Sequence, residues 1–277
     1  MKNIVKFFLM VVLVLPALPV MSAVPAEHDV EKLMRASGTW QQIEQVPALI
    51  ISGFEQARTQ GAPMSDADLA IMVEAAEQAY LAEHFLNKIR RALRDSMTAE
   101  EVREMLTWYE SDLGKRVSRA EMNATTVDAM TEMMANAEAL LENKDLVALS
   151  ARLDALLNWT QMVVTIQEFQ SEAVYTAVFS AIAPGRPIDI EEYRARLASE
   201  RGSLEEQTRQ LLALSSAYTY RDIDLDSMAE YERALATPSA RKFNQVMVQA
   251  IVDGYKETTR HFAAEVGREL AAAKQRR

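Results

Sequence analysis

Apolar residues recur every three to four positions along nearly the whole chain, which is the spacing of amphipathic α-helices. No stretch alternates apolar and polar residues in the way that a half-buried strand requires. The 277 residues include only eight glycines and eight prolines, so the turn residues of an all-β chain are missing, while strong helix formers abound. The pattern predicts an all-α protein, folded as a helical bundle.

Capping residues predict where several helices begin. Ser65 precedes an apolar stripe, and Thr98 with Glu101 forms the Thr-x-x-Glu pattern of a capping box. Asp224 is placed to cap a shorter helix, and Pro238 to begin the last long one.

We also expect one long helix after Gly114, because the apolar rhythm continues there for more than three heptads. Its inward positions are Val117, Ala120, Ala124, Val127, Met130, Met134, Ala137 and Leu141. A further long apolar helix is expected to run through Leu156, Ile166 and Val174 to a stop at Pro184.

The N-terminus has the three parts of a secretory signal. Two lysines form a basic front, an apolar run follows over residues 7–15, and small residues lead to Ala23 and Ala26. The run is shorter than the roughly 20 residues that span a bilayer, which disfavours an uncleaved anchor. The sequence therefore predicts a signal peptide over residues 1–23, with cleavage between 23 and 26. The mature product would be periplasmic or secreted, without stable membrane insertion.

Charge and cysteine content exclude several classes of function. Loss of the leader would leave 28 basic and 40 acidic residues, a net charge near −12. Such a surface repels phosphate backbones, so nucleic acid is not an expected partner. The absence of cysteine removes disulfides, thiolate catalysis and zinc–sulfur sites. No cofactor is predicted.

The two halves of the chain present the same features in the same order. With an offset of 126 residues, 98–109 aligns with 224–235 and 111–117 with 237–243. Cap, apolar stripe, small residue, basic pair and next apolar residue keep their order. Two diverged copies of one helical unit explain this most simply, although amphipathic helices can also be slid into register by chance. The predicted repeats are residues 27–145 and 146–277, packed as one bundle or as two domains.

Residues 98–117 carry the most distinctive pattern. It begins Thr-Ala-Glu-Glu-Val and ends Trp-Tyr-Glu-Ser-Asp-Leu-Gly-Lys-Arg-Val. This stretch resembles the signature of a family of exported bacterial proteins catalogued as domain of unknown function 2059. The diverged copy around residues 224–243 lacks the aromatic pair. The resemblance implies a helical, exported protein and no particular activity.

We interpret this signature as architecture, with aromatic area at a helix end, polar groups near a break and a glycine for close approach or a left-handed turn. The alternative is that Tyr109, Glu110, Lys115 and Arg116 line a recognition site. The signature positions are Trp108, Tyr109, Glu110, Ser111, Gly114, Lys115 and Arg116.

Catalytic and metal-binding motifs are missing. The three histidines form no His-Glu-x-x-His motif, and His261 with Glu265 would supply only two ligands on one helix face. Neither a Gly-x-Ser-x-Gly elbow nor a phosphate-binding glycine loop occurs. We therefore assign no catalytic residue and no metal ligand.

Methionine is the one unusual count, at 15, and Met130, Met133 and Met134 lie close together. Met130 and Met134 fit the inward rhythm of the expected long helix, which favours core packing. The alternatives are an adaptable apolar groove for a partner and Cu(I) binding by thioethers.

Two functional hypotheses follow. The leading one is a non-catalytic interaction or scaffold protein of the cell envelope, which holds a segment of an envelope protein or an apolar ligand in an inter-helix groove. The other is a hydrolase-like envelope enzyme with a carboxylate pair. The first predicts an apolar pocket, and the second predicts converging carboxylates with raised pKa values.

Overall fold

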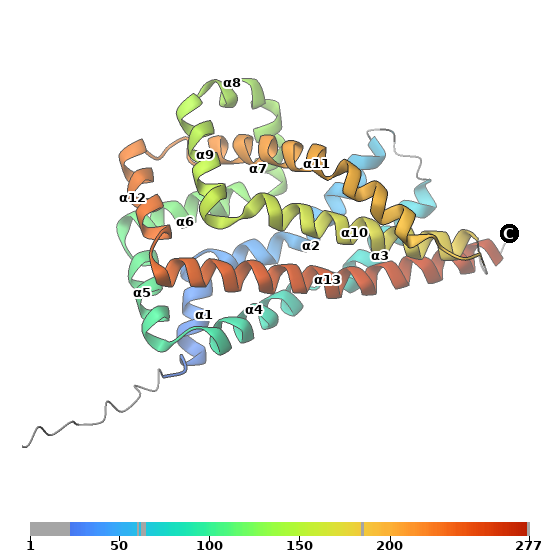
Figure 1. Cartoon of the computed structure of the whole chain (residues 1–277), viewed down its shortest axis with the longest axis horizontal. Coiled ribbons are helices and arrows are strands. Elements are labelled where there is room, and N and C mark those ends of the chain that lie inside the picture. The colour runs from blue at the N-terminus through green and yellow to red at the C-terminus, as the bar shows by residue number, and fades with distance from the viewer. Residues whose placement is uncertain (1–22, 60, 62–64, 184–185, 276–277) are drawn as a thin grey trace, which may run out of the picture.

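A computed structural model describes residues 23–59, 61, 65–183 and 186–275 (Figure 1). These residues form helices joined by short turns, and no strand occurs among them, so the all-α bundle is confirmed. Apart from its last residue, the predicted signal peptide lies outside the described residues. The helices are α1 (Glu27–Ala36), α2 (Thr39–Thr59), α3 (Asp66–Ala79), α4 (Ala82–Ser96), α5 (Ala99–Tyr109), α6 (Asp112–Ala124), α7 (Val127–Ala135), α8 (Ala137–Glu142), α9 (Lys144–Leu157), α10 (Trp159–Ile182), α11 (Ile190–Thr219), α12 (Leu225–Leu235) and α13 (Pro238–Gln275).

The expected helix starts are present. Ser65 and Asp68 form a capping box at α3, and Thr98 and Glu101 form one at α5. The Asp224 carboxylate accepts from the backbone N–H of Ser227 at 2.8 Å and caps α12. Each cap satisfies N–H groups that the first helical turn leaves without partners.

The single long helix expected after Gly114 is wrong, because the chain divides there into α6, α7 and α8. Thr125 is the residue at which α6 ends, and its hydroxyl donates to the Glu121 carbonyl at 2.7 Å. The next residue, Thr126, accepts from the N–H of Ala129 at 3.1 Å and caps α7. Threonine is favoured at N-cap positions such as Thr126, and the spacing of apolar residues gives no sign of such a cap.

The long helix expected in the second half also divides. Asn158 adopts a left-handed conformation, with φ 58°, between α9 and α10. Asparagine tolerates this region better than most residues. The Asp154 carboxylate then accepts from the backbone N–H and hydroxyl of Thr160, both at 2.7 Å, and so replaces a cap for α10.

The longest helix, α13, is the axis of the molecule (Figure 1). It packs along α10 on one side and against α3, α4 and α5 on another. α11 returns along α10 and reaches α9 and α6, while α7 and α8 form a protrusion at the top of the view. Within the described ranges, no helix is both long and apolar enough to cross a membrane.

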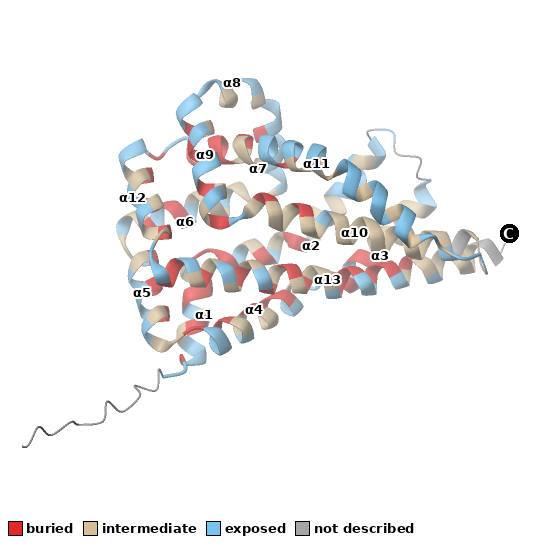
Figure 2. Ribbon diagram, viewed as in Figure 1, coloured by how far each residue is buried: buried red, intermediate tan, exposed pale blue. Residues whose placement is uncertain are grey.

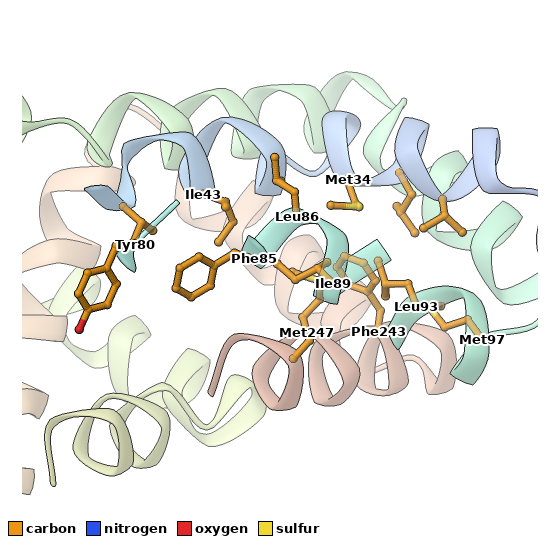
Figure 3. Packing of buried hydrophobic residues seen from close by; sticks show 14 of the residues in the cluster. Met34, Ile43, Tyr80, Phe85, Leu86, Ile89, Leu93, Met97, Phe243 and Met247 are labelled. Atoms are coloured by element: carbon orange, nitrogen blue, oxygen red, sulfur yellow. The ribbon is translucent and has the colours of Figure 1, made fainter. Parts of the chain in front are cut away.

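The main core joins the two halves of the chain. Phe85 and Ile89 of α4 pack with Phe243 and Met247 of α13 in one buried cluster (Figure 3). Burial is concentrated along these facing helices, whereas α8 has no buried residue and much of α11 is exposed (Figure 2). A second cluster joins Val117 of α6 with residues of α9, α11 and α12. Residues before and after position 145 therefore form one body with shared cores.

Candidate functional site

The signature residues form a tight turn between α5 and α6. The Ser111 hydroxyl donates to the Trp108 carbonyl at 2.6 Å and accepts from the N–H of Gly114 at 3.0 Å. A Cβ atom at Gly114 would lie 2.1 Å from that carbonyl oxygen and 2.9 Å from the Cα atom of Tyr109. Gly114 therefore serves close approach of the backbone, in a helical rather than a left-handed conformation.

The two signature aromatics contact the second half of the chain. The Trp108 ring stacks on Tyr231, with centroids 6.1 Å apart and planes at 4°. Buried Tyr109 meets Phe243 edge-on, with centroids at 6.0 Å. Such pairs add to the stabilisation from apolar burial. The aromatic pair therefore connects α5 to α12 and α13.

The turn between α12 and α13 repeats this hydrogen bonding with the offset of 126 residues. The Thr237 hydroxyl donates to the Ala234 carbonyl at 2.8 Å and accepts from the N–H of Ala240 at 3.4 Å. α5 and α12 each span 11 residues. These matches support the predicted repeat, which stays a prediction for the full extent of residues 27–145 and 146–277.

Two ion pairs connect the helices on either side of one turn to the helices on either side of the other. Arg116 of α6 lies 3.4 Å from Asp224, the cap of α12, and the equivalent Lys242 of α13 lies 2.7 Å from Glu101 in the first turn of α5. A basic residue after one turn therefore pairs with an acidic residue at the start of the other. The contacts are reciprocal, as in an approximate two-fold arrangement of the units.

The signature residues do not converge on one pocket. Trp108 and Tyr109 face a crevice towards α12 and α13, whereas Arg116 lines a separate hollow. Glu110 is exposed and pairs with Lys32 at 2.6 Å. Lys115 is exposed beside the turn. The residues of the predicted alternative recognition site are therefore divided between separate surfaces.

A buried carboxyl surrounded by tyrosines lies beneath the signature turn, and sequence reasoning missed it. The Glu121 carboxylate of α6 accepts from the hydroxyls of Tyr220 at 2.7 Å and Tyr231 at 2.9 Å. Part of Glu121 reaches the surface, but its carboxyl group is enclosed. Glu121 is about a hundred positions from either tyrosine, Tyr220 follows α11, and Tyr231 lies within α12. No local sequence pattern joins these three residues.

Burial is the largest cause of the shifted pKa values in this cluster. It raises the pKa of the Glu121 carboxyl above its ordinary value, and the two tyrosine hydrogen bonds offset only part of the rise. Burial, followed by the charge of Glu121, also raises the pKa values of Tyr109, Tyr220 and Tyr231. The cluster holds one carboxyl and hydroxyl donors, and not the carboxylate pair of the enzyme hypothesis.

A groove runs between the antiparallel helices α10 and α11. Its polar part has a volume of about 530 Å³ and includes Gln167, Gln170 and Glu200. Ser171 also belongs to the adjoining apolar part, which has a volume of about 450 Å³. The apolar part is lined by Ser171, Val174, Tyr175, Val178, Phe179, Tyr193 and Arg196.

Carboxylates beside this groove are held ionised by their partners. A hydrogen bond from Arg194 lowers the pKa of Glu172. Hydrogen bonds from Gln161 and Arg201 lower the pKa of Glu205. A general acid needs the opposite shift. Among the described residues, no group of three or more acidic or histidine side chains is arranged to hold a metal ion.

The methionines of α7 are divided between core and surface. Met133 is buried in a small cluster with Leu214 and Tyr218 of α11. Met130 and Met134 are 42 % and 51 % exposed, so the predicted inward positions of these two residues are wrong. Because Thr126 begins a new helix, the face of α7 that points into the bundle differs from the face predicted for one continuous helix. The three methionines therefore do not line one groove together.

Comparison with known proteins identifies one part of the chain. Residues 83–143 match the family described as "Uncharacterized protein conserved in bacteria (DUF2059)", and this range contains the whole signature at 98–117. No curated protein and no solved structure matches the chain. The resemblance predicted from the signature is thus confirmed, since residues 83–143 of this chain are similar to the DUF2059 family.

Proposed function

We propose that the protein is a non-catalytic interaction protein of the cell envelope, which binds an apolar ligand or an apolar protein segment in the groove between α10 and α11. The observation that carries this proposal is the apolar part of the groove, with Tyr175 and Tyr193 stacked at 4.0 Å beside aliphatic side chains. Its volume falls within the range of about 300–1,000 Å³ that is usual for ligand pockets.

The composition of α10 supports the same proposal. Apolar residues are spread around this helix and are not confined to one face, so burying them needs neighbours on several sides. Among its described side chains only Thr160 and Val164 are buried, and most of the others are half-buried. A ligand in the groove would cover apolar area that the bundle itself leaves accessible.

A neutral apolar fluorophore such as N-phenyl-1-naphthylamine tests the proposal. We expect the mature protein to bind it and Tyr175→Asp to bind it at least tenfold more weakly, because a carboxylate would be desolvated in the groove. Leu225→Asp is the matched control, since Leu225 is 47 % exposed at the start of α12, outside the groove. Absence of binding, or equal binding by both variants, would refute the proposal.

The location of the protein has a separate test. Export predicts that the mature protein is found in the periplasm or medium and that its N-terminus begins between residues 24 and 27. Cell fractionation followed by N-terminal sequencing measures both. An unprocessed product in the cytoplasm would contradict the envelope part of the proposal and leave the groove to be tested independently.

A further inference from the structure

Three arginines surround a small hollow between α6 and the connection from α11 to α12. Arg116 and Arg119 lie one helical turn apart on α6, and Arg221 comes from the connection. The hollow has a volume of about 250 Å³. A concentration of guanidinium groups is unexpected on a chain whose formal net charge is −10, and like charges one turn apart destabilise a helix.

The carboxylates around the hollow leave these arginines incompletely paired. Arg116 lies 3.4 Å from Asp224, and Arg221 lies 3.7 Å from Asp222 and 3.8 Å from Glu132. Other ion pairs of this protein are much closer, such as Arg152 with Glu232 at 2.6 Å and Lys242 with Glu101 at 2.7 Å.

Arg119 is the least paired of the three arginines, since it makes no hydrogen bond or ion pair within the part of the chain that the structure describes. Five N–H donors of a guanidinium group are therefore available at this position.

Two neutral donors and one carboxylate, that of Asp222, also line the hollow. The Asn123 amide and the Thr219 hydroxyl border the same hollow, and neither side chain has a hydrogen bond to another described residue. Arg221 is held in place by a hydrogen bond to the Tyr218 carbonyl at 2.7 Å and by the Tyr218 ring, 3.9 Å from its guanidinium carbon. A preorganised guanidinium loses little freedom when it binds an anion.

We propose that this hollow binds the phosphate group of a small anionic ligand. Arginine presents paired N–H donors that match two phosphate oxygens, and charge-assisted hydrogen bonds of this kind are the strong ones. The volume is below the roughly 300 Å³ of drug-sized pockets, which suits a phosphate or a small phosphate ester. Two of the three arginines lie within the matched domain, and the site is separate from the α10–α11 groove.

Titration calorimetry with inorganic phosphate at constant ionic strength tests the site on the full mature protein. We expect Arg119→Gln to weaken binding about tenfold and Arg119→Gln combined with Arg221→Gln to abolish it. The matched control is Arg91→Gln, because Arg91 is an exposed arginine of α4 with no partner among the described residues. Thermal unfolding of each variant verifies that it is folded.

The outcomes separate a specific site from general electrostatics and distinguish two sources of phosphate. Binding of inorganic phosphate that depends on Arg119 supports a soluble ligand. Binding to phosphatidylglycerol vesicles alone, with the same dependence on Arg119, supports a lipid headgroup. Absence of both, or equal weakening by Arg91→Gln, overturns the proposal.

Discussion

At the scale of single residues, Gly114 sets the geometry of the signature turn. Its backbone approaches the Trp108 carbonyl so closely that a methyl group would clash with backbone atoms, which cannot move aside as a side chain can. We expect Gly114→Ala to lower the free energy of unfolding by about 1–3 kcal/mol, or more, as overpacked positions do. Urea unfolding measures the change.

Gly202 provides the control for this prediction. It lies inside α11, and a Cβ atom there would meet nothing within 4 Å. Gly202→Ala is therefore expected to raise the free energy of unfolding by about 0.5–1 kcal/mol, because alanine has the higher helix propensity. Equal effects of the two substitutions would contradict the steric account of Gly114.

Glu121 gives a prediction on pH. Its pKa is raised in the folded state, so the unfolded chain releases this proton more readily and ionisation favours unfolding. The stability that this group contributes is fully present below the ordinary pKa of 4.5 and is lost as the pH rises through the folded value. A glutamine can accept from the same two tyrosines without ionising.

We therefore expect Glu121→Gln to gain stability relative to the wild type as the pH rises from about 4 to 8. Arginine-paired carboxylates such as Glu172, whose pKa is lowered, contribute the opposite trend, but equally to both proteins. The difference between the two unfolding free energies isolates Glu121. A difference that stays constant with pH would contradict the burial of an ionisable carboxyl.

At the scale of elements, α7 shows how one cap decides which face of a helix is buried. Because Thr126 starts a new helix, Ala129 and Met133 point into the bundle, and Val127, Met130 and Met134 form an exposed stripe. Apolar spacing alone cannot distinguish the two faces, since methionine occurs on both.

Two substitutions test this orientation. We expect Met133→Glu to lower the free energy of unfolding by at least about 3 kcal/mol, because it buries a charge without a partner. Met130→Glu is expected to change it by less than about 0.5 kcal/mol, as at an exposed site. Circular dichroism during thermal unfolding measures both changes. A larger loss of stability in Met130→Glu than in Met133→Glu would contradict this orientation and favour the inward position of Met130 that the sequence predicted.

At the scale of the whole molecule, α13 holds the first half of the chain together. Gly254 allows α13 to approach the Phe85 ring so closely that a Cβ atom would lie 2.7 Å from it. The main core contains α1 to α5 residues together with Phe243, Met247 and Phe262 of α13. Neither predicted repeat therefore possesses a complete core.

This arrangement predicts that residues 23–145 alone do not fold cooperatively, because the faces of α4 and α5 that meet α13 would be exposed. Denaturation of that fragment should lack the single sigmoidal transition of the full mature chain. Mixing it with residues 146–277 should restore helical content. A fragment that unfolds cooperatively by itself would instead favour two independent domains.

The sequence determined the features that depend on near neighbours. Apolar spacing, scarce glycine and proline, and local caps such as Thr98 with Glu101 decide helix formation within a few residues, and they predicted the fold class correctly. The signature was also local, and residues 83–143, which contain it, match the DUF2059 family. The helix ends at Thr125 and Asn158 were missed, because the apolar spacing of the residues around them continues across both positions.

Only the tertiary structure decided which distant residues meet. Glu121 gains its tyrosine partners, and Arg116 and Arg119 gain Arg221, because α6 packs beside the end of α11. Long-range contacts depend on how amphipathic faces fit together, and many pairings of such faces satisfy the same local pattern. The helices are therefore properties of the sequence read locally, while the buried carboxyl, the arginine hollow and the α10–α11 groove are properties of their packing.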